Sequence, residues 1–301
     1  MLKQNLTICS VSFRSKRYLE LNWELVKNLN PNQQLTWIVI ENTPPESSDR
    51  LNIHSTHFLV SEGYGLDTSQ LWPASYHHGI ALNRALSLVN TRFALLLDPD
   101  FYVVRKSWIT EVLEHVEENR LAFFGVPYHP KWHLKYRYFP CAHCMFIDLA
   151  KINKDSLDFR TGENPPKLRG RQGIGASQDT GRRVYNQYGR DVRVRSDCVL
   201  PVHRTSRDHP KRSRLWHRVL DKLLPDHLSY LPKRPGYYSI TGFRELGYPD
   251  VISYDWEEFM WKGEPFGFHI RGQSRGNRNA EREIDVLLHL IASFSGRGNA
   301  R

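Results

Sequence analysis

Long apolar runs are missing from this chain of 301 residues, and cysteines are scarce. No stretch approaches the roughly 18 uninterrupted apolar residues that a membrane-spanning helix requires. The apolar run within residues 1–13 is too short for a signal peptide, so it predicts a first strand. We therefore expect a cytoplasmic protein, whose contact with the inner face of the membrane would be peripheral.

The four cysteines, Cys9, Cys141, Cys144 and Cys198, provide no disulfide framework, which agrees with a reducing cytosol. The segment Cys141-Ala-His-Cys144 has the spacing of half a zinc site. A structural zinc ion needs four ligands, however, and no second C-x-x-C follows. We expect these thiols to fill core space as small apolar groups.

Two glycine-rich phosphate motifs are also missing. Neither G-x-x-x-x-G-K-[ST] nor G-x-G-x-x-G occurs, which excludes a P-loop and a Rossmann dinucleotide site. Acidic residues are outnumbered, because 32 Asp and Glu stand against 42 Lys and Arg, for a net charge of +10. This excess favours an anionic partner: a phosphorylated donor, an acidic polysaccharide, a lipid headgroup or nucleic acid. The basic residues concentrate in residues 190–218, where a solvated basic face is an equally good interpretation.

What is present is an alternation of apolar strands and amphipathic helices. Strands are predicted at residues 6–13, 35–40, 57–60, 93–97, 121–126, 144–149 and 192–202, and helices at residues 18–28, 79–89, 107–118, 180–188 and 280–294. This alternation is typical of a mostly parallel sheet with right-handed crossovers. We predict a single Rossmann-type α/β/α domain over residues 1–203, an irregular basic and aromatic extension over 204–262, and a return to the domain over 263–301 through a loop and a helix.

Residues 91–104, TRFALLLDPDFYVV, are the most informative stretch. The unbroken apolar run suits a strand buried on both faces, and Asp98-Pro-Asp100 ends it abruptly. Parallel sheets bind ligands at the edge where their strands end, so the two carboxylates would lie at such an edge. Hard oxygen ligands on a short turn suit Mg²⁺ or Mn²⁺. A turn that only caps the next segment remains an alternative.

Other polar residues are predicted to reach the same edge. Glu41 and Asn42 follow the second strand, where a nucleotide base or ribose would find hydrogen-bonding groups. A plain turn explains them equally well. His78 and Asn83 are predicted near the start of the helix at residues 79–89, where backbone N–H groups favour phosphate.

Two later segments carry further candidates. Asp179 lies where a Gly-, Pro- and Arg-rich loop meets a predicted helix, so it is either an N-terminal cap or a base held on a positive dipole. His269 and Arg271 lie in a glycine-rich segment, residues 263–276, with aromatic neighbours.

These residues resemble an inverting, GT-A-type glycosyltransferase of the family-2 kind. The matching features are the opening strand, the WIVIENT segment of residues 37–43, Asp98-Pro-Asp100 as the D-x-D motif, Gln178-Asp179 as the E-D pair, and His269 as the late metal-binding histidine. The resemblance covers about residues 6–202 and 263–275. Two positions depart from the family: Glu41 stands where Asp is usual, and Gln178 replaces the usual Glu, so Asp179 alone must supply the base.

The resemblance implies hexosyl transfer from a nucleotide-diphospho-sugar, with a UDP-sugar favoured, as in polysaccharide biosynthesis. The acceptor hydroxyl would belong to a saccharide, a lipid-linked molecule or a protein. Residues 208–262, which the resemblance does not cover, are our candidate acceptor or membrane-surface region. Asp98, Asp100 and His269 would hold Mn²⁺ or Mg²⁺, and Asp179 would take the acceptor proton. The donor would contact Glu41, Asn42, His78, Asn83, Asp98 and Arg271.

Two other functions are open from the sequence. A nucleotidyltransferase shares the sheet and the metal-bound carboxylates, but it would normally show a glycine-rich loop after the first strand, and residues 11–17 contain no glycine. A basic nucleic-acid-binding protein would explain the charge and the aromatic segments. It would not explain an acidic pair at the end of a buried strand, so nucleic acid is not the favoured partner.

Overall fold

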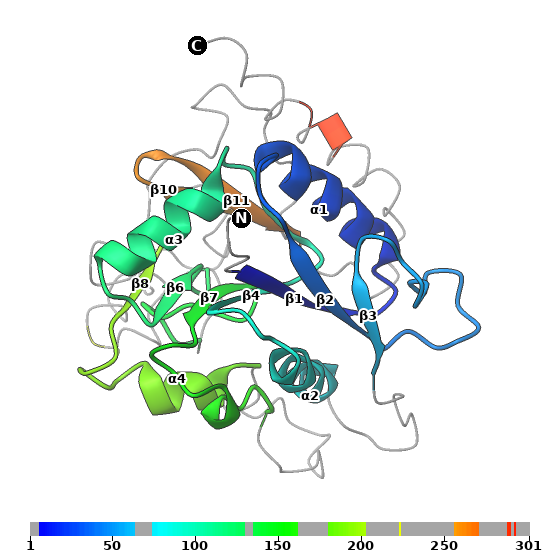
Figure 1. The fold of residues 1–301 in the computed structure, drawn as a ribbon. Helices are drawn as coiled ribbons and strands as arrows, with labels where there is room; N and C mark the ends of the chain where they lie inside the picture. The colour runs from blue at the N-terminus through cyan, green and yellow to red at the C-terminus, as the bar shows by residue number, and fades with distance from the viewer. Residues whose placement is uncertain are drawn as a thin grey trace.

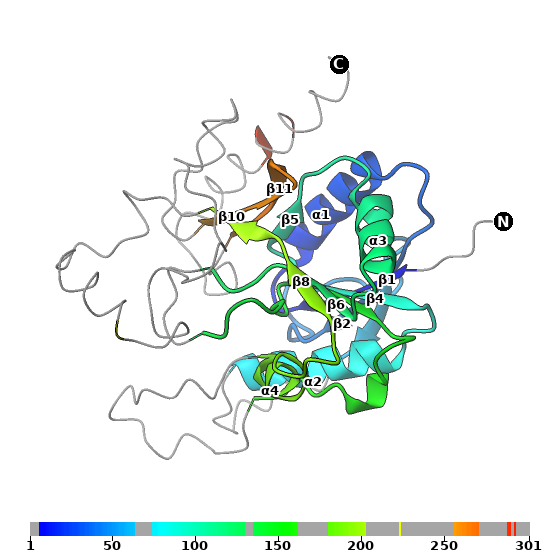
Figure 2. The ribbon, with the colours of Figure 1, turned by 90° about the vertical axis from the view of Figure 1, so that its left-hand side faces the viewer.

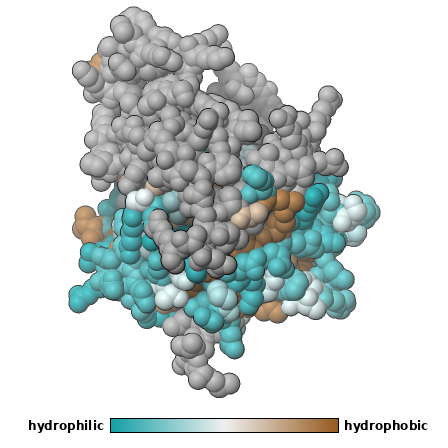
Figure 3. All heavy atoms as spheres, turned by 90° about the horizontal axis from the view of Figure 1, so that it is seen from above, coloured by the Kyte–Doolittle hydropathy of each residue, from teal (hydrophilic) through white to brown (hydrophobic). Residues whose placement is uncertain are grey.

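The computed structural model describes residues 6–63, 74–129, 135–161, 180–202 and 256–270, together with positions 223, 288, 289 and 292. No helix within these ranges has both the length and the apolar character needed to cross a membrane. Where the described surface is seen from above, it is mostly hydrophilic, with a few hydrophobic areas (Figure 3).

A seven-stranded sheet forms the centre of the protein, in the order β3-β2-β1-β4-β7-β6-β8. Its strands are β1 (Leu6–Ser12), β2 (Thr36–Glu41), β3 (Leu59–Glu62), β4 (Phe93–Leu97), β6 (Phe123–Gly125), β7 (Cys144–Asp148) and β8 (Ser196–Cys198). β1 is parallel to β2 and β4, β2 to β3, and β6 to β8, whereas β7 is antiparallel to both of its neighbours. The predicted α/β fold with a mostly parallel sheet is confirmed.

Helices cover both faces of this sheet. α1 (Lys16–Leu29) and α3 (Trp108–Glu118) lie on one face, and α2 (Ala74–Ser87) and α4 (Arg182–Tyr188) on the other (Figure 1). Every residue of β1, β4 and β7 is buried between these layers. Strands covered on both faces read as continuous apolar runs, which explains the sequence of residues 93–97.

A second sheet of four antiparallel strands lies beside the first, in the order β5-β11-β10-β9 (Figure 2). Its strands are β5 (Phe101–Val103), β9 (Leu200–Pro201), β10 (Trp256–Trp261) and β11 (Glu264–Ile270). β5 begins directly after Asp100 and pairs with β11, so that Phe101 lies opposite His269. The backbone N–H of Ile270 also donates to the Asp100 carbonyl at 2.9 Å. This pairing joins the last described strand to the end of β4.

The structure corrects several predicted elements. Residues 256–261 are not irregular, and residues 263–270 are not a loop, because they form a hairpin whose aromatic side chains are buried in the second sheet. Residues 192–202 contain two short strands in different sheets, not one strand. α2 begins at Ala74, five residues before its predicted start. Apolar spacing marked the buried turns of this helix, but it could not locate the polar first turn.

Asp158 ties three segments of the chain together. Its carboxylate accepts hydrogen bonds from Asn83 of α2 at 3.2 Å, from Arg160 at 2.9 and 3.0 Å, and from Arg183 of α4 at 2.5 Å. Burial of this carboxyl opposes its charged form, but the hydrogen bonds from Arg160, Asn83 and Arg183 outweigh burial and lower the pKa of Asp158. These hydrogen bonds connect α2 and α4 to the segment that contains Asp158 and Arg160.

We expect Asp158→Asn to lower the free energy of unfolding by about 1–2 kcal/mol at pH 7, because donor groups of three residues lose a charged acceptor that is partly exposed. The folded-state pKa of Asp158 is depressed, so its contribution is present above the unfolded value of about 4 and is lost as the pH falls through the folded value. The difference between the two proteins should therefore shrink below about pH 4. Denaturant unfolding at pH 7 and pH 3 measures it. Asp155→Asn, at an exposed position nearby, is the control, and a pH-independent difference would contradict the assignment.

Candidate active site

Asp98 and His143 meet because β4 and β7 are antiparallel. Leu97, the last residue of β4, lies opposite Cys144, the first residue of β7. Asp98, which follows Leu97, and His143, which precedes Cys144, are therefore neighbours. The Asp98 N–H donates to the His143 carbonyl at 2.9 Å. Their side chains also touch, with 2.6 Å between Asp98 Oδ2 and His143 Nδ1.

A second histidine reaches the same carboxylate from α2. His78 Nε2 lies 3.3 Å from Asp98 Oδ1. Burial disfavours the charged form of Asp98, but the two imidazoles outweigh it and hold the pKa of Asp98 well below its usual value. Burial of His78 favours its neutral form, but the negative charge of Asp98 outweighs burial, so the pKa of His78 is raised. Asp98 is therefore a carboxylate at neutral pH, clamped between two ring nitrogens.

His269 reaches the site from β11, 169 residues beyond Asp100. Its Nε2 lies 3.2 Å from Asp100 Oδ1, and its Nδ1 lies 3.4 Å from Oε2 of the buried Glu257 on β10. Burial opposes the imidazolium, but the carboxylates of Asp100 and Glu257 outweigh burial and raise the pKa of His269 to about 9. The ring is thus fixed from both of its nitrogens.

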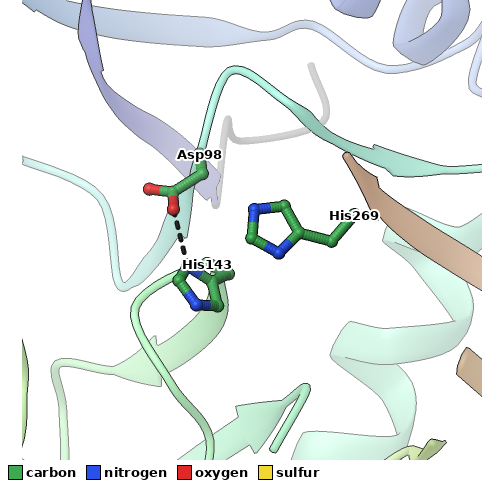
Figure 4. Close-up of side chains that lie close together, drawn as sticks. All are labelled: Asp98, His143 and His269. Atoms are coloured by element: carbon green, nitrogen blue, oxygen red, sulfur yellow. Dashed lines mark hydrogen bonds and ion pairs between the residues drawn. The ribbon is translucent and has the colours of Figure 1, made fainter. Parts of the chain in front are cut away.

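Asp98, His143 and His269 form a candidate metal site. One ligand atom from each lies within 4.8 Å of the other two, and the three side chains converge from the ends of different strands (Figure 4). One carboxylate and two imidazoles are a donor set that a divalent first-row ion accepts. The contact between Glu257 and His269 also fits, because a metal-binding histidine commonly passes its other N–H to a carboxylate. Asp100, which the sequence placed among the ligands, touches His269 but is outside this group of three.

Glu41 and Asn42 lie at the end of β2, at the same edge of the sheet, and are buried. Both oxygens of the Glu41 carboxylate accept backbone N–H groups, from Thr43 at 2.7 Å and from Leu51 at 2.8 Å. The backbone N–H of Asn42 donates to the carbonyl of Ser12, the last residue of β1. In this structure Glu41 shapes the loop that follows β2.

Asn83 does not lie at the start of a helix, because α2 begins at Ala74. Its amide nitrogen donates to Asp158, and its amide oxygen accepts from the Phe159 N–H at 2.9 Å. Both polar groups of this side chain therefore hold the segment after residue 157 against α2. His78, four residues earlier, is the member of the predicted pair that the structure brings to Asp98.

Asp179 and Arg271 lie outside the described residues. Thr180, the neighbour of Asp179, is described and well anchored. Its hydroxyl donates to the Ser75 carbonyl at 3.1 Å, and its own carbonyl accepts from the Tyr128 hydroxyl at 3.4 Å.

The Tyr128 ring connects this anchor to the cluster. It contacts the His143 ring edge-on, with 5.5 Å between the ring centroids and 90° between the planes. The residue after Asp179 is therefore linked through one side chain to a member of the candidate metal site.

Sequence reasoning missed His143 and Glu257. His143 belongs to the Cys141-Ala-His-Cys144 segment, whose thiols predict a core strand and give the histidine no role. A histidine directly before a buried strand was the available signal, and its value depends on the direction of that strand. Glu257 belongs to a segment predicted to be irregular, where no pattern indicated a buried acid.

We expect Glu41→Ala to lower the free energy of unfolding by about 2–4 kcal/mol, because two buried backbone N–H groups lose their acceptor. Denaturant unfolding measures this change. Glu46→Ala, at an exposed position of the same loop, is the matched control and should stay within about 0.5 kcal/mol of wild type. Equal stability of the two variants would show that the Glu41 carboxylate does not support the loop.

Comparison with known proteins gives only distant likenesses. No protein-family model and no curated protein matches the chain. S. aureus TarS 1–349 in complex with UDP-GlcNAc is 15% identical, over 52% of this chain and 48% of its own, with a TM-score of 0.36. The galactosyltransferase LgtC with donor and acceptor sugar analogs is 15% identical, over 50% of this chain and 62% of its own, with a TM-score of 0.34.

The mannosyltransferase PcManGT from Pyrobaculum calidifontis, in complex with GDP-Man and Mn²⁺, is 9% identical, over 51% of this chain and 49% of its own, with a TM-score of 0.35. The matched part of this chain thus spans less than two thirds of each of these proteins. With TM-scores below 0.5, these likenesses establish neither a family nor an activity.

Proposed function

We propose that the protein is a metal-dependent glycosyltransferase of the GT-A type. It would move a sugar, with inversion, from a nucleotide-diphospho-sugar to an acceptor hydroxyl. A UDP-sugar is the favoured donor, and the acceptor is a saccharide, a lipid-linked molecule or a protein. The observation that carries the proposal is the convergence of Asp98, His143 and His269 at the edge where the parallel strands end.

The chemistry of this transfer places a demand on that edge. As the bond from the sugar to the diphosphate breaks, negative charge develops on the leaving group. A bound divalent ion, Mn²⁺ or Mg²⁺, supplies the Lewis acid that neutralises such charge. Asp98, Asp100, His143 and His269 are the residues that would hold it, and Glu257 orients His269.

The other donor contacts belong to the same proposal. Glu41 and Asn42 would border the nucleotide base at the end of β2, with Glu41 acting through the loop that it holds. His78 would face the phosphates beside Asp98, and Arg271 would add positive charge there. Asn83 is not carried forward, because its amide binds Asp158 and Phe159.

Asp179 would be the catalytic base. In a single displacement the acceptor oxygen bonds to the anomeric carbon while the nucleotide diphosphate leaves from the opposite face, and a carboxylate takes the hydroxyl proton. Two observations support the choice: Thr180 is anchored to Ser75 and Tyr128, and Tyr128 packs against His143. Asp179 directly precedes this anchored threonine in the chain.

We expect Asp98→Asn to lower donor turnover by about 100-fold or more, because the variant removes an anionic ligand of the ion that would neutralise the leaving group. Incubation with UDP- and GDP-sugars and Mn²⁺, with release of free nucleoside diphosphate as the readout, measures this. Asp155→Asn is the control, at an exposed position on the 3₁₀ turn Lys154–Ser156. Full turnover by Asp98→Asn would reject the assignment, and release of sugar 1-phosphate in place of nucleoside diphosphate would indicate a nucleotidyltransferase.

We expect Asp179→Asn to bind the nucleotide sugar with wild-type affinity and to transfer it about 10²–10⁴-fold more slowly, because only proton removal is lost. Calorimetry gives the donor affinity, and product formation with a hydroxyl acceptor gives the rate. Gln178→Ala is the matched control, since it changes the neighbouring side chain and keeps the carboxylate. Transfer by Asp179→Asn at the wild-type rate would leave this residue as a helix cap.

A further inference from the structure

We infer that His143 is a metal ligand, and that its imidazole makes the site select Mn²⁺ and similar first-row ions over Mg²⁺. The inference rests on the metal site of the proposed function and not on sugar transfer. His143 is not part of the D-x-D pattern, and the sequence gives no preference between Mn²⁺ and Mg²⁺.

The backbone holds His143 firmly at the edge of the sheet. On one side its carbonyl accepts the Asp98 N–H at 2.9 Å, and on the other the Cys144 N–H closes a turn onto the Cys141 carbonyl at 3.3 Å. The same turn is fastened to the residue directly after β6, because the Cys141 N–H donates to the Val126 carbonyl at 2.7 Å. The position of the His143 Cα is therefore set by two strands of the central sheet.

The imidazole is directed at the other two members of the cluster. It stands 2.6 Å from Asp98 Oδ2, and its centroid lies 4.4 Å from that of the His269 ring (Figure 4). Tyr128 packs edge-on against the ring. A side chain with a carboxylate, an imidazole and a phenol ring around it has a defined orientation toward the site.

The spacing of the three groups suits one shared ion. Ligand atoms bound to an ion at about 2.1 Å lie no more than about 4.2 Å apart, twice the bond length. The ligand atoms of Asp98, His143 and His269 already lie within 4.8 Å of one another. Small side-chain rotations would therefore bring all three into coordination.

The donor set decides which ion is preferred. Mg²⁺ demands oxygen ligands in octahedral geometry and keeps several waters, whereas the divalent first-row transition ions, Mn²⁺ being the weakest binder among them, also bind sites of mixed nitrogen and oxygen ligands. Two of the three groups in the cluster are imidazoles. Asp100, whose carboxylate is 3.2 Å from His269 Nε2, would add one oxygen and would leave positions open for substrate oxygens.

His78 provides an internal comparison. Its Nε2 lies 3.3 Å from the second oxygen of Asp98, yet it is outside the group whose ligand atoms converge. We assign it the role of orienting the Asp98 carboxylate. Two histidines that touch one aspartate should thus behave differently toward the ion.

The number of coordinated nitrogens tests the inference directly. Pulsed EPR of the full chain loaded with MnCl₂ should detect two coordinated imidazole nitrogens in wild type and one in His143→Ala. His78→Ala is the matched control and should keep both. If His143→Ala does not fold, as judged by circular dichroism, His143→Gln takes its place. Two nitrogens in the folded His143 variant, or fewer than two in wild type, would overturn the inference.

Ion selectivity is the second readout. Calorimetric titration with MnCl₂ and with MgCl₂ should show Mn²⁺ binding more than about tenfold tighter in wild type. The same titration of His143→Ala should show Mn²⁺ affinity reduced at least about tenfold, with Mg²⁺ affinity changed much less. Equal affinities of the two ions for wild type would contradict the inference.

Failure of the inference is distinguishable from failure of the proposed function. If Mn²⁺ does not bind, yet nucleotide sugars are turned over in EDTA, the inference falls and sugar transfer survives without a metal. If Mn²⁺ binds through two nitrogens, yet no nucleotide sugar is turned over, the inference stands and the proposed transfer falls.

Discussion

The antiparallel pairing of β7 with β4 is the constraint on which the candidate site depends. In a parallel sheet the residue that precedes a strand lies at the opposite edge from the residue that follows its neighbour. β7 is the reversed strand of the central sheet, so the residue before it lies at the edge where β4 ends. That reversal places the imidazole of His143 beside the carboxylate of Asp98. Had β7 been parallel, the two groups would be separated by the length of the strand.

The second sheet applies the same principle across a much longer stretch of chain. β5 starts immediately after Asp100 and pairs with β11, and the Ile270 N–H donates to the Asp100 carbonyl. His269 is thereby brought to Asp100. The hairpin of β10 and β11 also supplies Glu257, whose carboxylate holds the far nitrogen of the His269 ring. Two main-chain ladders, β4 with β7 and β5 with β11, thus bring the residues of the site together. Only the side-chain torsions remain to be set.

The charges at this edge compensate one another at close range. Asp98 lies between His78 and His143, and His269 lies between Asp100 and Glu257. Buried ion pairs of this kind contribute little net stability, because desolvation of the charged groups offsets their attraction. Their concentration at the end of a buried strand therefore favours a role in binding. The Asp158 cluster has a different character, because it ties α2 and α4 to one loop through charged hydrogen bonds.

The sequence by itself determined the layered architecture and one half of the site. The apolar run at residues 93–97 and its abrupt end in Asp98 identified a buried strand and the edge at which it stops. Such local patterns are readable because burial on both faces requires continuous apolar residues. Only the tertiary structure decided that His143 belongs to the site and that β10 and β11 form a hairpin. It also decided that the polar groups of Glu41 and Asn83 form hydrogen bonds with neighbouring segments of the chain. These facts depend on strand direction and register, which link residues far apart in the chain and leave no periodic mark within either segment.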